Sequence, residues 1–360
     1  MAGVTLSITK ELCMKIKISV TIPFIILFYS ISLYAGEAEI IAAYNNGDYT
    51  KVIQESKSEE AKNGNAVVQG LLGTMYYTGK GVPIDYAQAL IWFRKSAEQG
   101  NATAQNFLGL IYLEGKGVST DYTQSLFWFR KATDQGFASA QCNLGMMYGN
   151  GYGVTQNYTE EVRLCRLAAD QGSVDAQKYL ATMYLLGNGI DKNYKEAEKW
   201  SRLVAEKGDA EAQFWLGSLY DMGKGVGQDY KEALKWYQLS ADQGFAQSQY
   251  DVGLMYDLGH GVPQDYKEAE KWYLLSASQG VASAQGGLGK LYAVGHGLSK
   301  NLVIAHMWLN ISAANSTNSK EQSEFAEWRE SVAKFLNAQQ IAEAQELAKK
   351  CTANQFKGCL

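Results

Sequence analysis

The sequence predicts an all-α chain, a right-handed α/α solenoid of seven helix-turn-helix repeats. Three observations support this fold class. A Gly-x-Gly pair recurs every 36 residues without insertion or deletion. A Leu-Gly-x-x-Tyr sequence, or a close variant, precedes each pair, and an Asp or Asn follows it at a fixed distance. A period of this length is typical of stacked arrays, in which each unit buries its apolar face against its neighbours. The pairs lie at Gly79/Gly81, Gly115/Gly117, Gly151/Gly153, Gly187/Gly189, Gly223/Gly225, Gly259/Gly261 and Gly295/Gly297.

Residues 1–36 have the pattern of an export signal. Lys10, Lys15 and Lys17 precede an uncharged run that ends at the small residues Ala35 and Gly36. This order predicts a cleaved signal peptide, with cleavage after Ala35 and no stable membrane insertion afterwards. The run is near the lower length limit for crossing a bilayer, so a retained anchor is the alternative. Translation could also start at residue 14.

Residues 37–63 predict a degenerate helix pair. Gly47 and Asp48 separate two short apolar segments, and Val52 and Ile53 are expected to point inward. Terminal units of an array are atypical because one of their faces meets water. We therefore expect an N-terminal helical cap.

Residues 64–315 hold the seven repeats, each with a helix A and a helix B. In the second copy Ala104, Leu108 and Ile111 lie on one face of helix A. The first glycine of each pair suits the left-handed residue that ends a helix. Helix B begins at an Asp or Asn cap with Gln or Glu three residues later in six copies, which predicts a capping box. These caps are Asp85, Asp121, Asn157, Asn193, Asp229, Asp265 and Asn301.

Two positions in the repeats break local preferences. The glycine of Leu-Gly lies inside helix A, where it costs about 1 kcal/mol relative to alanine. We expect a neighbouring helix, or the Trp of helix B, to approach it closely. In the third copy Glu161 occupies a slot that is otherwise small and apolar, and we expect it to loosen that repeat.

Residues 316–360 leave the pattern and predict a C-terminal helical cap. One helix should carry Phe325, Trp328, Val332 and Phe335 on one face. A second helix should follow and pack on the last repeat.

The repeat pattern resembles the Sel-one-like repeat (SLR) family, a relative of the tetratricopeptide repeat. The resemblance rests on Leu-Gly-x-x-Tyr, Gly-x-Gly-Val, Asp-Tyr and the following Trp-aromatic pair, and it covers about residues 64–315. It implies an α/α solenoid that binds proteins or peptides, has no chemistry of its own and lines its concave face with helix A.

Four of the five cysteines lie outside the predicted signal segment. An exported chain is expected to pair Cys351 with Cys359 in a disulfide that fixes the C-terminal cap. Cys142 and Cys165, on the two helices of one repeat, are either paired or two buried thiols.

The sequence favours no enzyme, cofactor or metal site. His260 and His296 occupy the variable position of Gly-x-Gly, and His306 has no partner at ligand spacing. The Gly-x-Gly elements follow no strand, so they lack the context of a nucleotide fingerprint. Asp221 and Asp257 recur at the repeat period, about 10 Å apart, which is wide even for an inverting glycosidase pair. With a net charge of −4 and no basic stripe, nucleic acid is not an expected partner.

Freely varying slots of helix A predict the binding face. If these slots face the groove, they form an aromatic ladder with two carboxylates beside it, which would favour a basic or amide-rich ligand. The alternative is that several rings fill the space between repeats. The candidates are Phe107, Tyr179, Phe214, Trp215, Tyr250, Asp221 and Asp257.

We therefore expect a non-enzymatic scaffold that binds a peptide or helix along its groove, exported to a bacterial periplasm or secreted. One alternative is an envelope protein that binds peptidoglycan fragments or a wall hydrolase. Another is a eukaryotic luminal quality-control adaptor, for which Asn157 and Asn315 would be glycan acceptors.

Overall fold

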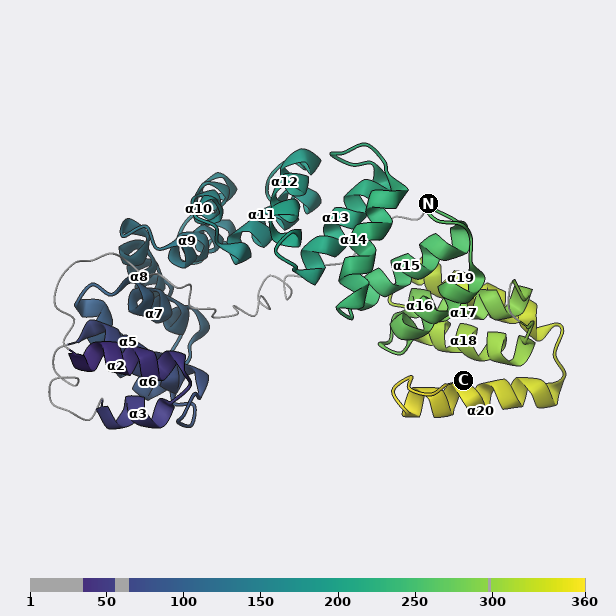
Figure 1. Ribbon diagram of the computed structural model, residues 1–360, viewed down its shortest axis with the longest axis horizontal. Helices are drawn as coiled ribbons and strands as arrows, with labels where there is room; N and C mark the ends of the chain where they lie inside the picture. Colours follow the sequence, from purple (N-terminus) through teal and green to yellow (C-terminus); the bar gives the residue numbers. More distant parts are fainter. Residues whose placement is uncertain (1–34, 56–64, 297–298, 360) are drawn as a thin grey trace. The chain divides into compact units, whose positions relative to one another are not determined.

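The computed structural model describes residues 35–55, 65–296 and 299–359, and every regular element within these ranges is a helix (Figure 1). The chain divides into two compact units, residues 1–176 and 177–360, which are described separately. The predicted signal segment falls outside the described residues up to position 34, so the signal peptide stays a prediction.

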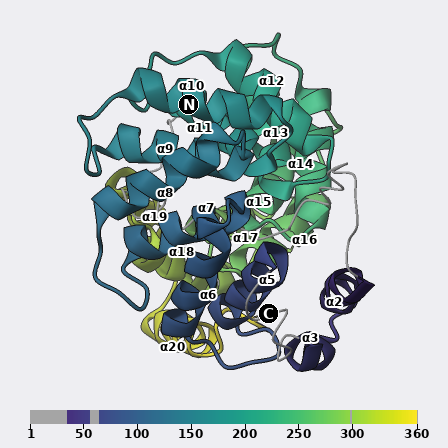
Figure 2. The same ribbon diagram turned by 90° about the vertical axis from the view of Figure 1, so that its left-hand side faces the viewer.

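The first unit begins with a helix pair and continues through three repeats. Helices α2 (Ala35–Asn45) and α3 (Tyr49–Glu55) lie next to α5 (Figure 2). Val52 is fully buried in their shared core with Ile40 and Met75. The repeat helices of this unit are α5 (Ala66–Thr78), α6 (Tyr86–Glu98), α7 (Ala102–Glu114), α8 (Tyr122–Asp134), α9 (Ala138–Asn150) and α10 (Tyr158–Asp170).

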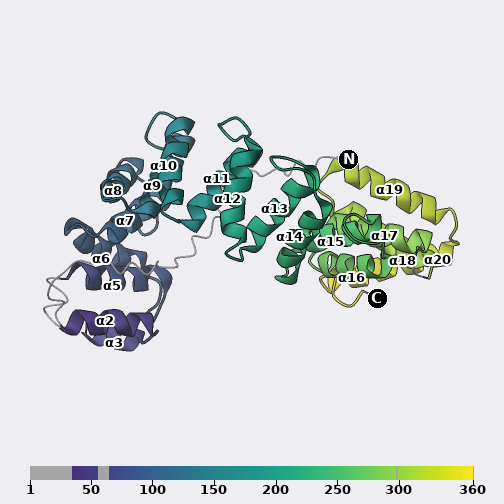
Figure 3. The same cartoon turned by 45° about the horizontal axis from the view of Figure 1, so that its top comes forward.

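The second unit holds the remaining repeats and two further helices. The repeat helices are α11 (Val174–Leu186, which starts at the boundary between the units), α12 (Tyr194–Ala205), α13 (Ala210–Met222), α14 (Tyr230–Asp242), α15 (Ala246–Leu258), α16 (Tyr266–Ala277), α17 (Ala282–Val294) and α18 (Leu302–Asn315). Helices α19 (Ser319–Ala333) and α20 (Ala338–Ala353) pack on the last repeat (Figure 3). In both units the odd-numbered repeat helices are helix A and the even-numbered ones are helix B.

The predicted start of helix B is present in all seven repeats, but only half of the capping box forms. The Asp85 carboxylate accepts a hydrogen bond from the Gln88 backbone N–H at 3.0 Å, and the other six caps do the same at the matching position. The cap's own N–H donates instead to a helix A carbonyl, as from Asp85 to Tyr76 at 2.9 Å. The capping-box prediction was therefore wrong in its second half, because the cap N–H is already used to tie helix B to helix A.

The two glycines of each pair have different roles. The first, such as Gly115, ends helix A in the left-handed region with φ 69°. The second, such as Gly117 with φ 73°, lies against the start of the preceding repeat's helix B, where a Cβ would come within 2.9 Å of Tyr86. The residue between the two glycines covers a tyrosine ring of the preceding repeat. The Lys116 Nζ lies 5.4 Å from the centroid of the Tyr86 ring, and the His260 and Tyr230 rings stack with their centroids 4.4 Å apart.

The helix A glycine is explained by the residue after the Trp, and not by the Trp itself. A Cβ on Gly217 would lie 2.8 Å from the Tyr237 ring, and one on Gly253 would lie 2.7 Å from Tyr273. Repeat four has Ala181 in place of the glycine, and the matching helix B position is the small Ser201. Of the two predicted causes, close approach of a neighbouring helix is confirmed, and contact with the Trp is not the cause.

Glu161 does not loosen the third repeat through a steric conflict. Its side chain is buried beside Gly149, where any Cβ would collide with the carboxylate. The absent side chain at position 149 supplies the space that Glu161 needs.

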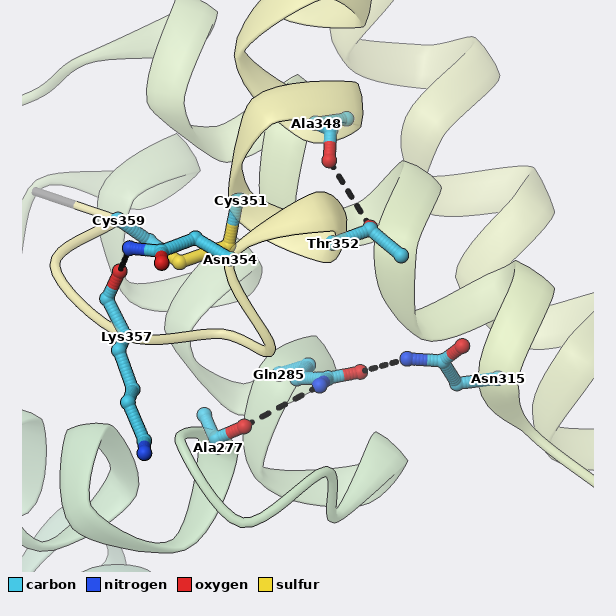
Figure 4. Close-up of a disulfide and its surroundings, with 9 residues drawn as sticks. All are labelled: Ala277, Gln285, Asn315, Ala348, Cys351, Thr352, Asn354, Lys357 and Cys359. Atoms are coloured by element: carbon cyan, nitrogen blue, oxygen red, sulfur yellow. Dashed lines mark hydrogen bonds between the residues drawn. A yellow bond between two sulfur atoms is a disulfide. The ribbon is translucent and has the colours of Figure 1, made fainter.

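Each helix A carries a buried glutamine, which was not predicted from the sequence, and four of these glutamines join successive repeats, namely Gln105, Gln213, Gln249 and Gln285. Gln105 is 3% exposed; its Nε2 donates to the Ala97 carbonyl of the preceding helix B at 3.1 Å. Its Oε1 accepts a hydrogen bond from Gln135, at the end of its own repeat's helix B, at 2.7 Å. The last repeat repeats this geometry with Gln285, Ala277 and Asn315 (Figure 4). The seven glutamines, each at most 6% exposed, are Gln69, Gln105, Gln141, Gln177, Gln213, Gln249 and Gln285.

The C-terminal cap carries the predicted disulfide. Cys351 and Cys359 are bonded with their Cα atoms 5.0 Å apart (Figure 4). Phe356, between them in the chain, packs against the adjoining core. Cys142 and Cys165 are also joined, with a Cα separation of 4.2 Å, which decides the open alternative in favour of a second disulfide. Phe335 is 77% exposed because α19 ends before it, so its predicted place on the buried face was wrong.

We predict that Gln105→Leu destabilises the first unit by about 1–3 kcal/mol, because it removes two buried hydrogen bonds, one to the Ala97 carbonyl and one from the Gln135 amide. Each of these two groups keeps one other hydrogen bond, with the Gly100 N–H and the Lys131 carbonyl respectively. Urea unfolding followed by circular dichroism measures the loss. The matched control is Gln124→Leu, because the Gln124 side chain is exposed on α8 and its replacement should cost under about 1 kcal/mol. Equal losses for the two variants would contradict the assigned role of the buried glutamine.

Candidate partner-binding face

The seven residues predicted for the binding face do not all lie together. Phe107 belongs to the first unit, whereas the other six belong to the second. Phe107 is 4% exposed and stacks on Phe93 with the ring centroids 4.7 Å apart. Tyr77 closes its other side at 5.3 Å. Phe107 therefore fills space between repeats, as the alternative held, and we leave it out of the candidate face.

The fifth and sixth repeats of the chain, which lie in the second unit, carry partly buried aromatic rings at matching positions of α13 and α15. Phe214 contacts Trp215 at 4.9 Å, Phe245 at 5.3 Å and Tyr237 at 6.0 Å. Tyr250 packs against Tyr273 at 5.7 Å. Phe214 and Tyr250 are thus supported from helix B, and each keeps part of its surface open. Trp215 is also half-buried and lies beside Phe214, while Tyr179 is half-buried on α11.

Phe214 and Tyr250 occupy the same position of helix A that Cys142 occupies in the third repeat, where this cysteine forms a disulfide with Cys165 of helix B. Cys142 stands 72 residues before Phe214, and Cys165 stands 72 before Tyr237. A disulfide in repeat three and ring contacts in repeats five and six therefore join the same two positions of helix A and helix B. The side-chain contact at these two positions therefore differs between repeats, while the two helices of the repeat keep the same arrangement.

Asp221 and Asp257 lie at the ends of α13 and α15, on the same slot. Burial raises the pKa of both carboxyl groups above their usual range. The Tyr273 hydroxyl donates a hydrogen bond to Asp257 at 3.2 Å. His260 lowers the pKa of Asp221 slightly against the effect of burial, so the carboxylate and the imidazole are electrostatic neighbours.

Asp251 is a further carboxylate of this face that the sequence analysis did not single out. It occupies in repeat six the slot that Trp215 occupies in repeat five. Burial raises the pKa of Asp251 to about 8, against the lowering effect of a hydrogen bond with Gln247 and with a smaller raising contribution from the charge of Asp221. The signal in the sequence was a charged residue at a slot filled by aromatic residues in the preceding repeats. We call Phe214, Trp215, Asp221, Tyr250, Asp251 and Asp257 the aromatic–acidic face.

The three histidines pack against other side chains of the protein. His260 and His296 stack on tyrosines, and His306 is 4% exposed, where burial lowers its pKa. Among residues 35–55, 65–296 and 299–359, no group of three or more His, Cys, Asp or Glu side chains is arranged to hold a metal ion. Nor does any helix in these ranges have the length and apolar character needed to cross a membrane.

The first unit has a shallow depression of about 550 Å³ between α8 and the turn after α9. Phe127, 46% exposed, lines it together with Arg130 and Lys131. It presents a cationic and apolar surface, in contrast to the carboxylates of the second unit.

The comparisons with known proteins decide the family. The model of the Sel1 repeat matches seven times, at residues 67–101, 102–137, 138–173, 174–209, 210–245, 246–281 and 282–316. The chain belongs to the Sel1 repeat family. The matched boundaries place one helix A and one helix B in each repeat of this Sel1 repeat protein.

One solved structure agrees with this assignment, and two others are similar to the chain at lower TM-scores. A Sel1 repeat protein from Oxalobacter formigenes is 32% identical, with 67% of this chain and 96% of that chain covered and a TM-score of 0.57. A protective antigen of uropathogenic Escherichia coli with an SLR fold is 28% identical, with 90% and 85% covered and a TM-score of 0.43. An immunity protein from Pseudomonas aeruginosa is 21% identical, with 60% and 82% covered and a TM-score of 0.38. No curated protein matches the chain significantly.

We predict that the unfolding free energy of the second unit falls as pH rises from about 4 to 8, in part through Asp251. Its carboxyl ionises near its ordinary pKa of 3.8 when unfolded but near 8 when folded. In that window the folded state binds more protons, so raising the pH favours unfolding. Asp251→Asn should remove this pH dependence. Its unfolding free energy, relative to that of the unchanged protein, should therefore rise by at least about 1 kcal/mol between pH 5 and pH 8.

Urea midpoints at pH 5, 6.5 and 8 measure this effect. The matched control is Asp242→Asn, because Asp242 is exposed at the end of α14. If Asp251→Asn and the unchanged protein show parallel pH profiles, the Asp251 carboxyl does not ionise differently in the folded state.

Proposed function

We propose that this Sel1 repeat protein is a non-enzymatic scaffold that binds a segment of another protein along the helix A face of its second unit. The observation that carries the proposal is the aromatic–acidic face. It combines Phe214, Trp215 and Tyr250, which keep part of their rings open, with carboxylates on the same two helices. Large aromatic side chains supply most of the binding energy in many protein interfaces.

The contacts that hold the repeats together support this proposal, because they are made by residues outside the aromatic–acidic face. The buried glutamines, the paired glycines and the rings beneath Gly217 and Gly253 hold each repeat together. The slots of the aromatic–acidic face change from repeat to repeat while these contacts recur. Such freedom fits residues that serve a partner rather than the fold.

We also propose that the protein works outside the cytoplasm, in a periplasm or as a secreted protein. Two disulfides support this location, because such bonds persist in oxidising compartments. The cationic and apolar pattern of residues 1–36 agrees with export. The luminal alternative gains no support from its two glycan triplets. Asn157 caps α10, and the Asn315 amide donates to Gln285 at 3.0 Å.

Capture of partners by the full chain, produced under oxidising conditions, tests the proposal. The comparison is between the unchanged protein, Phe214→Ala/Trp215→Ala and the control Leu203→Ala/Leu239→Ala, whose leucines are 39% and 42% exposed on helices α12 and α14. Circular dichroism first verifies that all three are helical. We expect proteins from the source organism's envelope fraction to be retained by the unchanged protein and the control, and lost from the aromatic double variant.

Two outcomes would overturn the proposal. If all three versions retain the same proteins, the binding face lies elsewhere. If none retains a protein while peptidoglycan fragments quench the tryptophan fluorescence of the unchanged protein, the wall-fragment alternative replaces the scaffold.

A further inference from the structure

The last repeat shows how a non-repeat segment can occupy the slots of the aromatic–acidic face. Where repeats five and six carry Phe214-Trp215 and Tyr250-Asp251, the last repeat carries Gly286 and Gly287. Phe325 of α19 fills the space over Gly286 so closely that a Cβ there would collide with its ring. Helix α19 lies beside α17 in this unit (Figure 3). The chain's own aromatic side chain thus occupies one slot, whereas the side chains at the neighbouring slots of α13 and α15 are partly exposed.

The uncovered part of the face is negatively charged on both sides. Asp221, Asp251 and Asp257 come from the repeat helices. Glu321 and Glu324 come from α19, and their charges raise the pKa of Tyr250 together with those of Asp251 and Asp257, in addition to the larger effect of burial. Four carboxylates, those of Asp251, Asp257, Glu321 and Glu324, are therefore electrostatic neighbours of the Tyr250 ring.

Few cations oppose these carboxylates. Lys290 is paired with Glu324 at 2.6 Å, lies 5.4 Å from the Phe325 ring and also lowers the pKa of Asp257 through its charge. His260 and His296 stack on Tyr230 and Tyr266 and lie near Asp221 and Asp257. Within the described ranges, no lysine or arginine forms an ion pair with Asp221, Asp251 or Asp257. With Asp251 protonated and Glu324 paired with Lys290, the carboxylates of Asp221, Asp257 and Glu321 are left to attract a cation next to the apolar rings.

We propose that the occupant of this face is a protein segment with a lysine or arginine beside an apolar residue. The inference rests on the proposed scaffold function and names the chemistry of its partner. The cation lies between Asp221 and Asp251, and its aliphatic stem packs on Trp215 and Tyr250. The apolar neighbour packs on Phe214, in the way that Phe325 packs over Gly286.

Such binding is coupled to proton release. The Asp251 carboxyl is largely protonated below pH 8 in the free protein. A cation placed next to it favours the ionised form, so the proton leaves for the buffer. The Asp221, Asp257, Glu321 and Glu324 carboxyls, the Tyr237 and Tyr250 hydroxyls and the two histidines face the same region. The Asp251→Asn variant separates its contribution from theirs.

Calorimetric titration of the full chain with synthetic peptides tests the inference. The probes are ten-residue peptides in which Lys-Leu and Arg-Phe pairs are set among Ser and Ala, and matched peptides with Gln in place of the cations. We expect the cationic peptides to bind at least tenfold more tightly than the Gln peptides. Asp221→Asn and Asp251→Asn should each weaken binding at least fivefold, and the control Asp242→Asn should leave it unchanged.

Proton release gives a second readout. Titrations at pH 7 in phosphate and in Tris should differ in apparent enthalpy for the unchanged protein and agree for Asp251→Asn. Equal affinity for cationic and Gln peptides, or a buffer dependence that persists in Asp251→Asn, would overturn the inference. If envelope proteins are captured through Phe214 and Trp215 but the cationic peptides show no preference, the scaffold proposal stands and the charge inference fails. If capture is insensitive to those rings, the scaffold face itself is wrong.

Discussion

The structure depends on one buried hydrogen-bonding arrangement, the glutamine of helix A. Each repeat must bury helix ends against the next repeat, and buried backbone carbonyls are costly without a partner. The Ala205 carbonyl accepts from the Gly208 backbone N–H at 3.0 Å and takes a second hydrogen bond from Gln213 at 3.1 Å. Gln213 in turn accepts a hydrogen bond from Gln243 at 2.8 Å. One side chain thereby fixes three helices from two successive repeats. In repeat four Lys207 takes the place of the donating glutamine and reaches Gln177 at 3.3 Å.

Because backbone geometry and buried glutamines set the frame, other helix A positions are free to vary. The same pair of slots holds Cys142–Cys165 in one repeat and Phe214–Tyr237 in another. The next slot along holds Trp215, Asp251 or Gly287. A scaffold of this kind acquires a binding face by substitution at few positions, without a change in fold. The charge and rings of the second unit are one result.

The sequence was sufficient to predict the helices, since period, glycine pairs and caps are local signals repeated seven times. It was less informative where the answer depended on a contact between repeats. The cap N–H of Asp85 bonds to Tyr76 rather than to its own helix, and Phe107 stacks in the core rather than facing a ligand. Gln105 recurred at the same period, but its two long-range hydrogen bonds could not be read from one repeat. Asp251 was overlooked because its raised pKa comes from burial in the folded chain.

The central claim is that the frame and the binding face are separate sets of residues. Urea denaturation of Trp215→Ala and Tyr273→Ala tests it most directly, because Trp215 belongs to the face and Tyr273, 1% exposed, lies beneath Gly253. The account predicts a loss under about 1.5 kcal/mol for Trp215→Ala. It predicts a loss of roughly 3–5 kcal/mol for Tyr273→Ala. Equal losses would show that Trp215 is part of the frame, and would contradict the account.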